Sequence, residues 1–271
     1  MNSLSNVKRI VIKVGTSTLT HSTGMLNLRQ IEALVKIIAD VKNSGKEVVL
    51  VSSGAVGIGA GKLGLSGRPD NTTLKQACAA VGQSELIQVY DRSFSEYNHI
   101  VAQVLLTRDV IDDKTTKENA HNAFIELIKM NVLPIVNEND TISIEEIKAI
   151  ENAKVGFGDN DRLSAIVASL IDADLLIILT DTDGLFDKDP RQNSDATLID
   201  TVHNIEDAIS CVSEGNGSTF STGGMATKLE AAKIATSNDI KTVIMNGNNP
   251  KKMYELLEGK KVGTRFLTKG E

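Results

Sequence analysis

Two lysines of this sequence lie beside small residues in a way that suits an anion. Lys13 lies at the end of the apolar stretch 7–14, and Gly-Thr-Ser follows at 15–17. Lys228 lies one helical turn after Gly224, so its side chain can reach back past the free N–H groups of a first helical turn. A cation beside closely approaching backbone amides favours phosphate. Lys13 alone is also explained by an ammonium group at a strand end that reaches solvent.

Polar residues also follow the other apolar stretches. Ser-Gly-Ala at 53–55 predicts a strand-to-helix turn whose amides and helix dipole favour negative charge, although an ordinary helix cap explains it as well. The segments 137–140 (NEND) and 158–161 (GDND) concentrate acids and amides. Turn formation explains either one, because Asn and Asp are favoured in turns. Together they predict a site for a metal-bound nucleotide or an amino group.

Two lysines, two glycine turns and a pair of acids suit phosphoryl transfer. That reaction brings anions together, so catalysis rests on positioning and charge neutralisation rather than on a covalent intermediate. The sequence shows no Ser-His or Cys-His pairing that would indicate a protein nucleophile. Its four histidines have no metal-ligand spacing, and Cys78 and Cys211 are expected to be small buried apolar residues.

Alternating apolar segments predict the scaffold that positions these residues. Strands are expected at 7–14, 47–51, 101–106, 132–136, 175–179, 241–245 and 262–266, and helices at 28–41, 72–97, 117–130, 162–171, 224–237 and after Pro250. This order predicts βαβ units, hence a three-layer α/β/α sandwich with a mostly parallel central sheet, formed by one domain over residues 1–271. Ligands of such sheets bind at the carboxyl ends of the strands.

The composition excludes several classes of function. The 271 residues carry a net charge of −6 without a basic tract, which argues against nucleic-acid binding. No apolar run approaches the roughly 20 residues that span a bilayer, and the polar first six residues are too short for a signal peptide. We therefore expect a cytoplasmic protein with neither a membrane nor a nucleic-acid partner.

Two glycine motifs are misleading. Gly59, Gly61 and Gly64 spell GxGxxG, but they lie beyond the strand-to-helix turn, so the dinucleotide interpretation is weak. Gly61-Lys62 fails as a phosphate-binding P-loop, because Val56 replaces its leading glycine and Leu63 its hydroxyl residue.

Six segments in this order resemble the glutamate 5-kinases of the amino acid kinase family, over about residues 7–266: VIKVGTSTLT, VSSGAVGIG, PIVNENDTIS, GFGDNDRLSA, LTDTDGLFDKDP and STGGMATKLEAA. The resemblance implies transfer of the γ-phosphoryl group of ATP, with Mg2+, to the side-chain carboxylate of L-glutamate. The product is L-glutamyl 5-phosphate, and the reaction is the first step of proline biosynthesis. Glutamate would bind over the N-terminal half and ATP over the C-terminal half, with the γ-phosphoryl group between them.

The same resemblance implies roles for individual residues. Catalytic roles fall to Lys13, Lys228, Asp161 and Asp159: the lysines stabilise the transferring phosphoryl group, the first acid orients both lysines, and the second helps to hold Mg2+. The implied glutamate contacts are Ser53, Gly54, Asn137, Asp140 and Asn160. The implied ATP site consists of Lys13, Gly15, Thr180, Asp181, Thr222, Gly223, Gly224, Met225, Ala226, Thr227 and Lys228.

Further expectations come from the family. Proline is expected to inhibit at the glutamate site, and dimers or tetramers are expected. Many members carry a C-terminal PUA domain, and this sequence, which ends at Glu271, is expected to be the form without it. The alternatives are a kinase of the same family for N-acetylglutamate, aspartate, uridylate or carbamate; a non-catalytic amino acid sensor; and a nicotinamide-dependent oxidoreductase, which the glycine placement disfavours.

Overall fold

The computed structural model describes residues 4–65, 67, 69–107, 109–142, 160–214 and 224–268. The chain divides into two compact units, the central unit Val14–Asn160 and the terminal unit, which combines Met1–Lys13 with Asp161–Glu271. The expectation of one domain stays a prediction.

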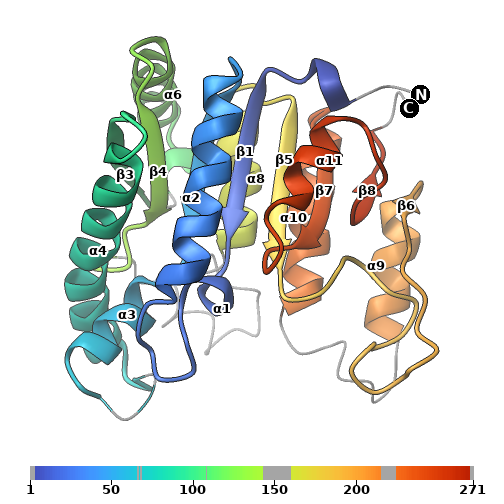
Figure 1. Ribbon diagram of the computed structural model, residues 1–271, viewed down its shortest axis with the longest axis horizontal. Coiled ribbons are helices and arrows are strands. Elements are labelled where there is room, and N and C mark those ends of the chain that lie inside the picture. The colour runs from blue at the N-terminus through green and yellow to red at the C-terminus, as the bar shows by residue number, and fades with distance from the viewer. Residues whose placement is uncertain are drawn as a thin grey trace. The chain divides into compact units, whose positions relative to one another are not determined.

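The central unit contains parallel strands between helices. Its elements are α1 (Thr16–Leu19), α2 (Leu28–Asn43), β2 (Glu47–Ser52), α3 (Ala55–Lys62), α4 (Thr72–Ser95), β3 (Val101–Leu106), α5 (Asp109–Asp112), α6 (Lys114–Lys129) and β4 (Leu133–Glu138). The strand order is β3-β4-β2, and both pairings are parallel. In Figure 1, α2 and α4 lie on the near face of these strands and α6 on the far face, as right-handed crossovers require.

The terminal unit is also built from mostly parallel strands and helices. Its elements are η1 (Leu4–Asn6), β1 (Arg9–Val14), α8 (Asn160–Leu170), β5 (Leu175–Thr180), β6 (Thr201–Val202), α9 (Ile205–Glu214), α10 (Gly224–Ser237), β7 (Lys241–Asn246), α11 (Lys252–Leu257) and β8 (Thr264–Phe266). β5 pairs in parallel with both β1 and β7, β7 pairs antiparallel with β8, and β8 pairs in parallel with β6. Figure 1 shows α11 in front of the strands and α8 behind them. The expected mostly parallel α/β/α class is confirmed.

Aliphatic side chains explain why these segments become strands. All six residues of β5 and of β4 are buried, which is the pattern of strands covered on both faces. A side chain caps the start of α6: the carboxylate of Asp113 accepts a hydrogen bond from the Thr116 N–H at 2.7 Å, so α6 starts three residues before its expected start. Cys78 is buried, as expected, whereas the side chain of Cys211 lies outside the described residues.

Gly59 of the GxGxxG motif has a packing role, which it shares with Gly82 of α4. A Cβ atom on Gly59 would lie 1.8 Å from the Cys78 carbonyl oxygen, and one on Gly82 would lie 1.8 Å from the Ala55 carbonyl oxygen. The backbones of α3 and α4 are therefore in direct contact, which only glycine permits. This contact fixes the start of α3 beside the middle of α4.

Among the described residues, no helix is long and apolar enough to cross a membrane.

Candidate active site

Three buried charged side chains meet at the carboxyl ends of the strands of the terminal unit. Lys13 lies near the end of β1, Asp161 in the first turn of α8 and Lys228 in the first half of α10. The Nζ atom of Lys13 lies 2.5 Å from Asp161 Oδ1, and that of Lys228 lies 3.0 Å from Asp161 Oδ2. The residues are 5%, 1% and 9% exposed, respectively. The structure thus brings two ammonium groups together on one carboxylate.

The electrostatics of this triad favour an added anion. Burial raises the pKa of Asp161, but the adjacent Lys13 and Lys228 ammonium groups outweigh burial, so the pKa of this carboxyl lies below its ordinary value. Asp161 is therefore ionised at neutral pH. Two ammonium groups on one carboxylate give the triad one net positive charge in a buried position, where charges interact more strongly than in water.

The first turn of α10 faces the same point. The hydroxyl of Thr227 donates to Asp161 Oδ2 at 3.0 Å, and Lys228 Nζ donates to the Gly224 carbonyl at 2.9 Å. A helix start also supplies unpaired N–H groups and the positive end of the helix dipole. The segment is therefore suited to the phosphates of a nucleotide.

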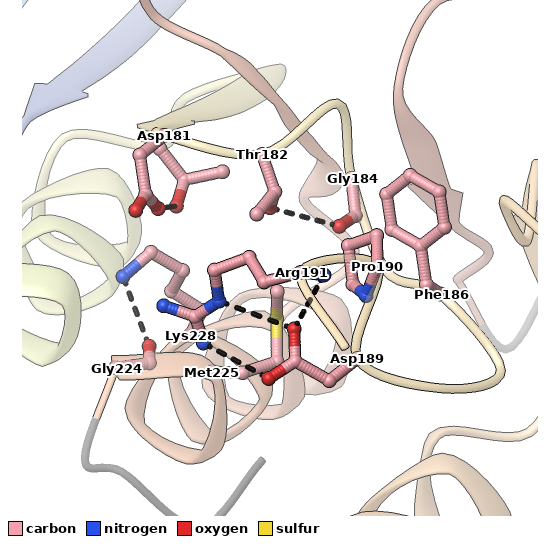
Figure 2. Close-up of a pocket in the computed structure, with 11 residues that line it drawn as sticks. Asp181, Thr182, Gly184, Phe186, Asp189, Pro190, Arg191, Gly224, Met225 and Lys228 are labelled. Atoms are coloured by element: carbon pink, nitrogen blue, oxygen red, sulfur yellow. Dashed lines mark hydrogen bonds and ion pairs between the residues drawn. The ribbon is translucent and has the colours of Figure 1, made fainter. Parts of the chain in front are cut away.

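A pocket of the terminal unit opens beside Lys228 (Figure 2). Its lining includes the expected nucleotide residues Thr180, Asp181, Gly224, Met225 and Lys228. The hydroxyl of Thr180 donates to Asp181 Oδ1 at 3.1 Å. The methyl side chain of Ala226 is exposed and does not line this pocket. Gly15, another residue expected at the nucleotide, belongs to the central unit and is not part of the pocket lining. Thr222 and Gly223 lie outside the described residues.

The opposite wall of the pocket comes from residues for which the sequence predicted no role. They are Thr182, Gly184, Phe186, Asp189, Pro190 and Arg191, from the loop after β5. Asp189, only 4% exposed, accepts from Arg191 Nε at 3.1 Å and from its Nη2 at 3.4 Å. Figure 2 shows the guanidinium group held over the pocket by this fork. The sequence feature that could have indicated these six loop residues is their position in a polar loop directly after a buried strand.

A second cluster of polar side chains lies in the central unit. The amide nitrogen of Asn160 donates to Ser53 Oγ and to Asn137 Oδ1, both at 2.9 Å. Gly54 caps α3 with a φ of 110°, in the left-handed region that favours glycine, and so turns the chain directly after Ser53. Asp140 is half-buried two residues beyond β4. The expected glutamate residues Ser53, Asn137 and Asn160 are therefore in contact.

The described residues do not form a metal centre. They contain no group of three or more His, Cys, Asp or Glu side chains that could hold a metal ion. Both carboxylate oxygens of Asp161 face lysines, so this acid is not free to bind Mg2+. The expected metal residue Asp159 lies outside the described residues.

Comparisons with known proteins agree with this geometry. The model of the amino acid kinase family matches residues 8–246. A glutamate 5-kinase of Clostridium perfringens is 52% identical over 267 residues, with 98% of each chain covered. A glutamate 5-kinase of Enterococcus faecalis is 48% identical over 269 residues, covering 99% of this chain and 98% of the relative.

Solved structures show the same fold at low identity. An isopentenyl phosphate kinase of T. acidophilum is 19% identical with a TM-score of 0.65, over 96% of this chain and 100% of the other. A carbamate kinase of Giardia lamblia is 17% identical with a TM-score of 0.66, over 97% and 99%. Because the family model spans most of the chain and the curated relatives align nearly end to end, the chain belongs to the amino acid kinase family.

Proposed function

We propose that this protein is an ATP-dependent kinase that transfers the γ-phosphoryl group of ATP to the side-chain carboxylate of L-glutamate. The product is L-glutamyl 5-phosphate, which places the enzyme at the first step of proline biosynthesis, in the cytoplasm. The observation that carries the proposal is the convergence of Lys13 and Lys228 on Asp161. Relatives named glutamate 5-kinase at 47–52% identity support the choice of substrate.

In the proposed reaction the nucleotide occupies the pocket beside Lys228. Its phosphates lie along the first turn of α10, and the γ-phosphoryl group meets the two ammonium groups. Their positive charge offsets the repulsion between the entering carboxylate and the phosphate oxygens. Asp161 holds both lysines in place and does not itself take the proton or the phosphate. Mg2+ bound with ATP would neutralise further phosphate charge.

Glutamate is proposed to bind at the cluster of the central unit. Ser53, Gly54, Asn137, Asp140 and Asn160 offer a hydroxyl, a backbone amide, two side-chain amides and a carboxylate. The carboxylate of Asp140 is the group suited to the substrate ammonium, and the hydroxyl and amides are suited to its carboxylate oxygens. Asn160 and Asp161 are consecutive, so one short stretch of chain supplies both a substrate contact and the acid between the lysines.

A substrate panel tests the choice among kinases of the family. ADP release is measured with ATP and Mg2+ against L-glutamate, L-aspartate, N-acetyl-L-glutamate, UMP and carbamate. We expect kcat/KM to be largest for L-glutamate. Turnover of aspartate or UMP without turnover of glutamate would reject the assignment, and no turnover of any acceptor would favour a non-catalytic sensor.

Inhibition by proline at the glutamate cluster and assembly into dimers or tetramers stay predictions of the family resemblance. Proline should raise the KM for glutamate without lowering kcat. Light scattering on the purified protein gives the number of chains per particle. A monomer, or a KM that does not respond to proline, would contradict the respective prediction.

A further inference from the structure

A row of hydrogen-bonded side chains leads from α4 to the proposed glutamate cluster. Gln83, which is 8% exposed, accepts a hydrogen bond from the Asn137 amide nitrogen at 2.7 Å. Asn137 Oδ1 accepts from the Asn160 amide nitrogen at 2.9 Å, and that nitrogen also donates to Ser53 Oγ at 2.9 Å. We call these four residues, Gln83, Asn137, Asn160 and Ser53, the amide relay. All of them belong to the central unit.

Two backbone groups fix the direction of the amide relay. The Glu138 N–H donates to Asn137 Oδ1 at 2.9 Å, and the Ser52 carbonyl accepts from the Asn160 amide nitrogen at 3.4 Å. A backbone N–H can only donate and a carbonyl can only accept, so neither asparagine amide can be reversed without losing its backbone partner. Gln83 must then present its carbonyl oxygen to Asn137.

The direction of the relay determines what its outer end offers a ligand. Because Ser53 Oγ accepts from Asn160, the hydroxyl hydrogen of Ser53 can donate elsewhere, and it has no acceptor within the part of the chain that the structure describes. Because the Asn160 nitrogen is directed at Ser53 and Asn137, its amide oxygen is available as an acceptor as far as the described residues are concerned. A hydroxyl donor suits a carboxylate and an amide acceptor suits an ammonium group. Both charged groups occur in an amino acid.

Gln83 can reach Asn137 because α4 lies very close to α3. The residue before it, Gly82, allows the backbones to touch, since a Cβ there would lie 1.8 Å from the Ala55 carbonyl oxygen. Ala55 begins α3, two residues after Ser53. The same helix contact therefore places both ends of the amide relay.

From this geometry we propose that Gln83 is a positioning residue, which holds the Asn137 side chain in its place in the amide relay and so orders the contacts to an amino acid substrate. This inference rests on the proposed function, and it assigns Gln83 no contact with the substrate. Without an acceptor at position 83, the buried Asn137 nitrogen has no partner there, which is unfavourable enough to displace the side chain from its present position. Asn160 and Ser53 would then lose their fixed orientation.

The test compares Gln83→Met, which removes the acceptor at similar volume, with Gln83→Glu, which keeps an acceptor oxygen whether ionised or protonated. The control is Gln88→Met, the same substitution at an exposed position of α4. Glutamate and ATP kinetics are measured for each variant, together with thermal unfolding. Gln83→Met should raise the KM for glutamate about tenfold, the effect expected from one buried group that loses its partner. Its kcat and its KM for ATP should stay within about twofold.

Gln83→Glu should return the KM for glutamate to within about threefold of the unsubstituted enzyme, and Gln88→Met should leave it unchanged. The proposal is overturned by an unchanged KM in Gln83→Met, by an equal rise in the Met and Glu variants, or by a parallel rise in the KM for ATP. If neither Gln83→Met nor Gln83→Leu folds, Gln83 serves the fold rather than the substrate, and the proposal also fails. Absence of glutamate turnover in the unsubstituted enzyme would instead reject the proposed function itself.

Discussion

Replacing Asp161 by Asn removes the charge on which both buried lysines converge while keeping the size of the side chain. The variant changes the net charge of the triad from +1 to +2. We therefore expect the substitution to act differently on anion binding and on catalysis. Ground-state affinity for ATP should be kept or become tighter, because more positive charge is left for the phosphates. Turnover should fall, because neither lysine is held in place.

The size of each effect follows from the geometry. The lysine nitrogens lie 2.5 and 3.0 Å from the two oxygens of one carboxylate. They are thus within about 8 Å of each other, where two like charges repel by roughly 2 kcal/mol at an effective dielectric constant of about 20. Removing one partner of a buried ion pair costs about 3–5 kcal/mol of stability. Loss of one well-placed electrostatic group lowers kcat by about 100- to 1,000-fold.

The assays are steady-state kinetics, ATP binding by calorimetry and thermal unfolding of Asp161→Asn beside the unsubstituted protein. A kcat within tenfold of the unsubstituted value, in a folded variant, would refute the role given to the triad. Weaker ATP binding with unchanged kcat would show that Asp161 acts on nucleotide affinity alone. Both results would contradict the charge argument.

The pH dependence of stability supplies an internal check on the same variant. The pKa of Asp161 is lowered in the folded protein, against the effect of burial, by Lys13 and Lys228. A depressed carboxyl pKa contributes stability above the unfolded value of 3.8, and this contribution is lost as the pH falls through the lower folded value. The stability difference between the unsubstituted protein and Asp161→Asn should therefore be constant near neutral pH and shrink below about pH 4. A difference that grows on acidification would contradict this sign.

Three further substitutions test separate parts of the structure. Lys228→Ala should leave the protein folded and lower kcat about 100- to 1,000-fold, whereas near-normal turnover would remove its proposed role. Gly82→Ala should destabilise the protein by about 1–3 kcal/mol in urea unfolding, since the added carbon meets the Ala55 carbonyl oxygen at 1.8 Å; an unchanged midpoint would show that α3 and α4 can separate freely. Asp189→Asn should weaken the hydrogen bonds to Arg191 and raise the KM for ATP about threefold to tenfold, with the KM for glutamate unchanged. An unchanged KM for ATP would show that this wall of the pocket does not contribute to ATP binding.

Much of the fold was predictable because its strands are continuous aliphatic runs. β5 was expected at 175–179 and extends over Leu175–Thr180 in the structure. The short elements β6 and α9 were missed, since two residues carry no period and the ten-residue helix follows a long polar loop. Local composition cannot show that a two-residue strand pairs with β8, because that pairing depends on residues more than 60 positions away.

For the site, the sequence indicated the kind of chemistry but not all of the residues that take part. The residue types after each strand indicated anion and amino-group chemistry, and the parallel topology indicated that they share one sheet edge. The Asp189–Arg191 fork was not assigned, because only the folded loop brings it to the pocket. Gln83 was likewise missed: it lies mid-helix, and its hydrogen bond to Asn137 spans 54 positions of sequence. Spacing along one chain cannot reveal such a partner.

Trapping the acyl phosphate tests the proposed reaction most directly. The protein is incubated with ATP, Mg2+, L-glutamate and hydroxylamine, and ADP and the γ-glutamyl hydroxamate are measured together. Phosphorylation of the side-chain carboxylate predicts one hydroxamate for each ADP, with both products strongly reduced in Asp161→Asn. Release of ADP without hydroxamate, or equal hydroxamate from the variant, would contradict phosphoryl transfer to glutamate at the lysine–aspartate triad.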